Sequence, residues 1–136
     1  AFRLPLSTRY IIKGKIIHGN LEFYTPRDFS IQNISLTGIG IVVPKIKKEN
    51  LMPLAGLKSN EIIMIGIVLI DMNQDKPIGT LPIKAQITRI NPHHSETHIR
   101  MGLKIMNLEI KKETVLNKFI HDAQIEELKR LSGRDL

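Results

Sequence analysis

The sequence feature that most constrains the fold is a change of hydrophobic period near Asn107. Before it, short segments rich in β-branched residues alternate apolar and polar side chains, with Gly, Pro or Asn clusters between the segments. Such alternation is typical of strands with one buried face. After it, apolar residues recur at helical spacing from about Glu113 to Leu131. We therefore expect a set of strands followed by one terminal helix.

The alternating segments number six, and they predict strands at residues 10–17, 27–34, 38–43, 61–72, 80–91 and 97–107. Short strands at regular spacing are typical of a small barrel. The predicted fold class is thus mainly β, a six-stranded antiparallel β-barrel with a C-terminal α-helix packed on it. Residues 45–60 lack the alternation and are expected to form a long connection. A buried patch is expected there at Leu51, Met52 and Leu54.

Alternation also predicts which side chains share a face. In residues 27–34, Phe29 and Ile31 lie on one face, and unbroken alternation would add Asn33 to it. One face of residues 80–91 is expected to hold Leu81, Ile83, Ala85, Ile87 and Arg89. The opposite face is expected to hold Pro82, Lys84, Gln86, Thr88 and Ile90.

The chain has 136 residues, enough for one domain with its own core, and we assign residues 1–136 to a single domain. It begins at Ala1 without a methionine, so we expect it to be clipped from a longer chain. The absence of cysteine excludes a disulfide framework and thiol catalysis, and it fits a reducing cytoplasm. No apolar run approaches the ~20 residues that a membrane-spanning helix needs.

The formal net charge of +7 implies an anionic partner, such as nucleic acid, a phosphate ligand, an acidic protein face or a membrane surface. An equally good interpretation is that the charge serves only solubility. Lys45, Lys47, Lys48 and Lys58 could steer an anion, although a solvated loop is the commoner role of such a stretch. No aromatic pair flanks these lysines, which argues against a platform for single-stranded nucleic acid.

No catalytic motif is recognisable, and the acidic residues show no pairing with a nucleophile. The chain is therefore not expected to be an enzyme or to carry a cofactor. His93, His94 and His98 invite a metal interpretation. Adjacent residues of a strand face opposite sides, however, and no carboxylate clearly converges on them, so a solvated turn is favoured and no metal is expected.

The most informative short motif is Asn-Ile-Ser-Leu-Thr-Gly at residues 33–38, between two apolar strands. Asn33 offers a donor and an acceptor, Ser35 offers a hydroxyl, and Gly38 permits positive φ and close approach of a ligand. One interpretation is a capped turn, in which these groups satisfy local backbone, and this is the commoner use of such residues. The other is a small cradle for a planar polar ligand. The residues alone leave both open.

The pattern [Asp/Asn]-x-Ser-x-x-Gly resembles the second signature of the PilZ domain family, bacterial receptors for cyclic di-GMP. Three other segments resemble the layout of that family. They are Phe2-Arg3-Leu4-Pro5-Leu6-Ser7, like the end of its N-terminal R-x-x-x-R segment; Met101-Gly102-Leu103-Lys104-Ile105, like its late glycine-containing strand; and residues 118–120 with 124–130, like the helix that closes flagellar-brake-type members. The resemblance covers essentially the whole chain and implies a six-stranded barrel.

The resemblance implies four ligand-binding residues, Arg3, Asn33, Ser35 and Gly38. The implied ligand is cyclic di-GMP, bound as one molecule or as a stacked dimer. Arginine suits it, since a guanidinium binds guanine N7 and O6, stacks on purines and pairs with phosphate. Arg3 matches the second arginine of the family's segment. The first would precede Ala1, and Arg9 lies at the wrong spacing to replace it.

Binding would then order the N-terminal segment and alter contacts with a neighbouring domain or an effector protein, with outputs such as motility, biofilm or exopolysaccharide control. Two alternatives remain. An adaptor that acts by protein contact without the nucleotide is supported by the incomplete arginine pair. A basic barrel that binds nucleic acid is supported by the +7 charge, although the cyclic dinucleotide is the preferred partner.

Overall fold

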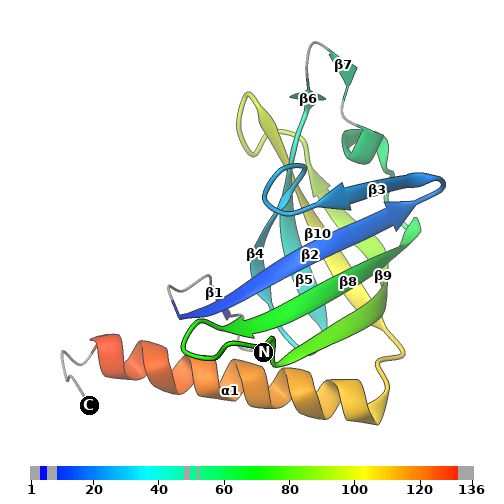
Figure 1. Ribbon diagram of the computed structural model, residues 1–136. Helices are drawn as coiled ribbons and strands as arrows, with labels where there is room; N and C mark the ends of the chain where they lie inside the picture. Colours follow the sequence, from blue (N-terminus) through cyan, green and yellow to red (C-terminus); the bar gives the residue numbers. More distant parts are fainter. Residues whose placement is uncertain (1–3, 6–8, 48–49, 52, 132–136) are drawn as a thin grey trace.

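The structure, a computed structural model, describes residues 4–5, 9–47, 50–51 and 53–131. Its strands are β1 (Leu4–Pro5), β2 (Tyr10–His18), β3 (Leu21–Tyr24), β4 (Ser30–Ile34), β5 (Gly38–Pro44), β6 (Ile46–Lys47), β7 (Asn50–Leu51), β8 (Ile62–Asp71), β9 (Gly79–Asn91) and β10 (His98–Met106). The helical elements are a 3₁₀ turn, η1 (Pro53–Gly56), and the helix α1 (Ile110–Leu131). Eight strands form one curled antiparallel sheet in the order β1-β4-β5-β10-β9-β8-β2-β3, and α1 crosses one end of it (Figure 1).

The six longest strands, β2, β4, β5, β8, β9 and β10, correspond to the six predicted ones, and α1 is the predicted helix. The mainly β barrel-like class with a C-terminal helix is therefore confirmed. The helix begins at Ile110, three residues before the expected Glu113. The connection at residues 45–60 contains the β6–β7 hairpin and η1, with Leu54 buried as expected. The side chains of Leu51 and Met52 lie outside the described part of the structure.

The interior is filled mostly by aliphatic side chains, which alternate with outward-facing residues along β2, β8, β10 and most of β9. On β10, for example, the buried residues are Ile99, Met101, Leu103 and Ile105. The helix covers one end of this core with Leu116, Phe119, Ile120 and Ala123. The ring of Phe119 meets that of Tyr10 edge-on, with 5.6 Å between the ring centroids. Close packing of this kind makes burial, rather than helix propensity, the main source of stability for α1.

Gly14 lies where β2 passes closely over the side chains of β4. A Cβ atom on Gly14 would lie 2.9 Å from Cδ1 of Ile31 and 3.2 Å from Cζ of Phe29. The backbone N–H of Gly14 donates to Oγ1 of Thr25 at 2.8 Å, and the N–H of Thr25 donates to the carbonyl of Gly14 at 3.0 Å. The segment that leads from β3 to β4 is thereby held against β2. Glycine is favoured here because a Cβ atom would force the buried side chains of Ile31 and Phe29 to shift.

Arg9 joins the barrel to the helix. Its Nε donates to Oδ1 of Asp71 at 3.0 Å and its Nη2 to Oδ2 at 3.2 Å, while Nη1 contacts Oε2 of Glu126 on α1 at 2.9 Å. The hydrogen bond from Arg9 lowers the pKa of the Asp71 carboxyl below its ordinary value of 3.8. The guanidinium also lies 4.9 Å from the centre of the Tyr10 ring. Arg9 is thus engaged in holding the start of β2, the end of β8 and α1 together.

Replacing Gly14 by alanine should destabilise the protein by roughly 1–3 kcal/mol, because the new methyl group overpacks the core against Ile31 and Phe29. The matched control is Gly66→Ala on the neighbouring strand β8, where a Cβ meets nothing within 4 Å. That control should be neutral or slightly stabilising. Urea unfolding followed by far-UV circular dichroism measures both variants. Equal stability of the two would show that β2 and β4 can separate at little cost.

The Arg9→Gln variant should be clearly less stable than the natural chain at neutral pH, because charged hydrogen bonds to the buried Asp71 are lost. The folded-state pKa of Asp71 is depressed, so this stabilisation is full above pH 3.8 and disappears as the pH falls through the lower folded-state value. Unfolding curves from pH 7 downward should therefore converge for the two proteins in acid. Arg130→Gln, which breaks an exposed pair within α1, is the control and should leave the free energy of unfolding nearly unchanged.

Candidate functional site

The turn between β4 and β5 is organised by Ser35. Its hydroxyl oxygen accepts hydrogen bonds from the backbone N–H of Gly38 at 3.1 Å and of Thr37 at 3.3 Å. The N–H of Ser35 donates to the carbonyl of Gly38 at 2.9 Å. The N–H of Ile105 donates to the carbonyl of Thr37 at 2.9 Å, which holds the turn against β10. Because Ser35 is only 2% exposed, its first role is to cap and rigidify this turn.

Asn33 is turned outward by a β-bulge. The register of β4 on β5 shifts between Ile31 and Asn33, so the alternation breaks and Ile34, rather than Asn33, enters the core. The expectation that Asn33 continues the face of Ile31 was therefore wrong. Its side chain lies against Gly40, where a Cβ would be 2.8 Å from Oδ1 of Asn33. The amide thus occupies the space that any other residue at position 40 would fill.

Gly38 does not need positive φ. Among the described glycines only Gly19 has a positive φ, so Gly38 does not use the conformational freedom that glycine permits. The glycine that requires a close approach in this turn region is Gly40, beneath Asn33. Both Gly38 and Gly40 lie on the outer face of β5, opposite Lys104 and Gly102 of β10.

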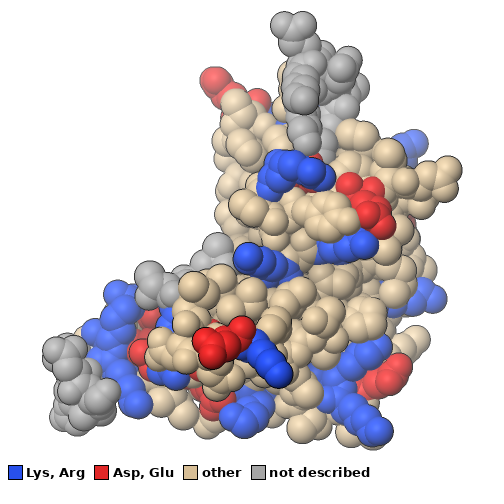
Figure 2. Space-filling view, viewed as in Figure 1, with Lys and Arg blue, Asp and Glu red and all other residues tan. Residues whose placement is uncertain are grey.

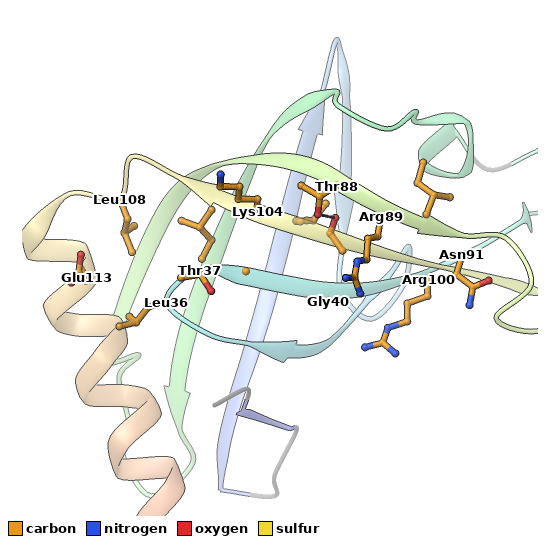
Figure 3. A pocket seen from close by; sticks show the side chains of 15 residues that line it. Leu36, Thr37, Gly40, Thr88, Arg89, Asn91, Arg100, Lys104, Leu108 and Glu113 are labelled. Atoms are coloured by element: carbon orange, nitrogen blue, oxygen red, sulfur yellow. Dashed lines mark hydrogen bonds between the residues drawn. The ribbon is translucent and has the colours of Figure 1, made fainter. Parts of the chain in front are cut away.

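The outer faces of β5, β10 and β9 form an open trough of about 950 Å³. Figure 3 shows it from close by, with polar side chains along its walls and bare glycine backbone in its floor. The side chains that give it polarity are Thr37, Thr88, Arg89, Asn91, Arg100, Lys104 and Glu113. Its floor contains Gly38, Gly40 and Gly102. Three cations against one carboxylate favour an anionic ligand, and a glycine floor lets a flat group lie against the backbone.

A second bulge puts Arg89 in this trough. Gly102 pairs with Arg89 and Leu103 with Ile87, which leaves Thr88 as an extra residue. The hydroxyl of Thr88 donates to the carbonyl of Gly102 at 3.2 Å. The face of the strand changes at this point, so Arg89 points outward and Ile90 packs against the core. The predicted placement of Arg89 on the core face and Ile90 on the other was therefore wrong, because alternation alone cannot reveal an inserted residue.

The structure brings three of the four predicted site residues together. Gly38 lines the trough, Asn33 lies against its floor at Gly40, and Ser35 holds the turn between them. Arg3 lies outside the described residues. The strand that follows Arg3 in the sequence, β1, pairs with β4, with Leu4 opposite Ile34 and Pro5 opposite Asn33. Strand β1 therefore lies beside the end of β4 that leads into the turn.

Other candidates from the sequence lie elsewhere. Among the described residues, no group of three or more His, Asp or Glu side chains is arranged to hold a metal ion. His93 lies in the β9–β10 turn, and the ring of His98 contacts the hydroxyl of Thr97 at 2.7 Å. Lys45 donates to the carbonyl of Ser95. In the part of the chain that the structure describes, no helix is long and apolar enough to cross a membrane.

The curled sheet, its capped turn and the terminal helix define a small β-barrel domain with an open polar trough on its outer face. The model of the PilZ domain family matches residues 1–122. The chain belongs to the PilZ domain family. No curated protein matches it significantly in sequence.

Solved structures share the fold. The PilZ domain of YcgR from Escherichia coli, solved with cyclic di-GMP, is 18% identical with a TM-score of 0.63, covering 96% of this chain and 95% of that domain. YcgR from Escherichia coli in complex with cyclic di-GMP is 19% identical with a TM-score of 0.67, covering 97% of this chain and 48% of YcgR. The MrkH–cyclic di-GMP complex from K. pneumonia is 16% identical with a TM-score of 0.66, covering 94% and 53%. This chain therefore spans about half the length of YcgR and MrkH.

Deleting Thr88 should leave the fold intact, because removal of the extra residue restores regular pairing of β9 with β10 without moving any side chain to the other face. The expected cost is about 0.5–1.5 kcal/mol, the loss of the bond to Gly102. Deleting Gln86 from the same strand is the control, because it interrupts regular alternation and should abolish cooperative unfolding. Thermal unfolding of the two deletion variants, followed by circular dichroism, measures the difference in stability. Equal damage by both deletions would mean that Thr88 is an integral member of the strand.

Proposed function

We propose that this domain is a receptor for cyclic di-GMP that converts binding of the ligand into altered contacts with a neighbouring domain or an effector protein. Membership of the PilZ family supports this, as do the structural neighbours that were solved with the ligand. The observation that carries the proposal is the pairing of β1 with β4 at Asn33, since Asn33 in turn lies against Gly40 in the floor of a trough lined by three cations and one carboxylate. We propose the cytoplasm as the compartment of this receptor.

In this proposal Asn33, Ser35 and Gly38 serve the ligand in different ways. Asn33 contributes an amide that can donate to and accept from a guanine edge. Ser35 acts through the turn, whose backbone it fixes, and Gly38 leaves the wall of the trough open. Arg3, directly ahead of β1 in the sequence, supplies a guanidinium for a phosphate or a guanine. The order of the segment would then depend on the ligand, which is the switch that alters protein contacts.

The adaptor without nucleotide remains the second candidate. The observation in its favour is that the Ser35 hydroxyl is buried and already engaged within its own turn. The nucleic-acid alternative gains less support. Figure 2 shows basic and acidic side chains interspersed over the visible face, so the net charge is not gathered there into one continuous basic surface.

The Gly40→Ala variant tests the proposed site. The new methyl group would lie 2.8 Å from Oδ1 of Asn33, so it must displace that side chain while the backbone stays in place. We expect a folded protein whose affinity for cyclic di-GMP falls about tenfold or more, equivalent to ~1.4 kcal/mol, whereas Gly66→Ala binds like the natural chain. Arg3→Ala should weaken binding as well. Isothermal titration calorimetry gives the affinities.

The same titration separates the two candidates. It is made on this chain and on a version that adds any residues preceding Ala1 in the natural gene product, with linear guanine nucleotides as competitors. Binding of cyclic di-GMP to either form supports a receptor. No heat from either form, with the protein folded by circular dichroism, would refute the receptor and leave the adaptor.

A further inference from the structure

Two arginines differ from the others in their partners. Three of the described arginines form ion pairs with carboxylates: Arg9 with Asp71, Arg27 with Asp28 and Arg130 with Glu127. Arg89 and Arg100 pair with no carboxylate of the described residues, and both line the trough. A surface arginine that is left without an internal anion in a concave site is available to an anionic ligand.

The pairing of β9 with β10 fixes the positions of Arg89 and Arg100. Arg89 is directed outward by the bulge and lies over Gly102, whose Cβ position is 3.4 Å from Cβ of Arg89. Arg100 lies two residues before Gly102 on β10, opposite Asn91. In Figure 3 the two side chains extend to the same side, which is that of Gly40. Their Cα atoms therefore stand on adjacent strands, and neither depends on the order of the N-terminal segment.

A continuous strip of neighbouring positions, called the lane below, runs across the outer face of the sheet from Arg89 to Asn33. Asn33 lies against Gly40, Gly40 is opposite Gly102, and Arg89 lies over Gly102. The lane crosses β4, β5, β10 and β9, three strand spacings of ~4.8 Å each, or about 14 Å. No side chain rises from its two central positions, which are both glycine. A flat, extended, anionic molecule can therefore contact the amide at one end and the guanidinium groups at the other.

We propose that Arg89 and Arg100 form a second, sheet-borne arginine pair that recognises a guanine base and a phosphodiester of the bound cyclic dinucleotide. This inference rests on the proposed function, because it concerns the same trough. A guanidinium fork can donate to both N7 and O6 of guanine. Adenine offers N7 beside a donor amino group, so the same fork rejects it. The pair thus supplies selectivity for guanine over adenine as well as charge.

The test compares variants that keep the charge but remove the fork. Arg89→Lys and Arg100→Lys are titrated with cyclic di-GMP and cyclic di-AMP by calorimetry, and thermal melts verify folding. Each should weaken binding of cyclic di-GMP by tenfold or more and narrow the preference over cyclic di-AMP. The matched control, Arg130→Lys, alters an arginine of α1 that does not line the trough and should stay within twofold of the natural chain.

Three outcomes overturn the inference. If the natural chain binds cyclic di-GMP and both lysine variants bind it within twofold, the pair has no part in recognition, while the proposed receptor function stands. If the lysine variants keep the preference for guanine and only Arg89→Ala and Arg100→Ala lose affinity, the arginines supply charge alone and the guanine assignment is refuted. If the folded natural chain binds no cyclic di-GMP, the proposed function fails and this inference falls with it.

Discussion

The whole structure depends on filling the interior of a curled sheet with aliphatic side chains. The chain has no tryptophan, so isoleucine and leucine from every long strand supply most of this volume. Close packing requires that β2 and β4 approach closely, which Gly14 permits. Once the interior is full, polar side chains can lie only on the outer face or in the turns. The candidate site is therefore a feature of the outer face, and its shape follows from how the strands pair there.

Much of this could be predicted from the sequence, because the strands that build the core alternate clearly. The six longest strands and the helix follow directly from the two periods. The strand β3 was missed since four residues containing Glu22 show no alternation that distinguishes them from a turn. The short strand β1 exists only through its pairing with β4, a tertiary contact that no local pattern encodes.

The site could be predicted only in part, for a physical reason. Asn33, Ser35 and Gly38 form a local motif, and such a motif is visible in the sequence. Arg89 lies near them because the bulge on β9 leaves it on the outer face, whereas unbroken alternation would have pointed it into the core. Gly40 matters because the bulge on β4 turns the side chain of Asn33 toward it. An inserted residue leaves no compositional trace, since Gln32 and Thr88 are ordinary strand residues.

The bulge at Thr88 also has an evolutionary consequence. A barrel with a filled core can hardly gain a new surface arginine by exchanging a core residue, because each such exchange would open a cavity or bury a charge. A bulge takes up a single inserted residue, so the side chains on both sides of the insertion keep their faces and the hydrophobic positions stay in the core. Small binding barrels can in this way change the length and local bend of a strand beside the ligand while the core stays filled, and relatives with the same core would then differ in the shape of the ligand surface.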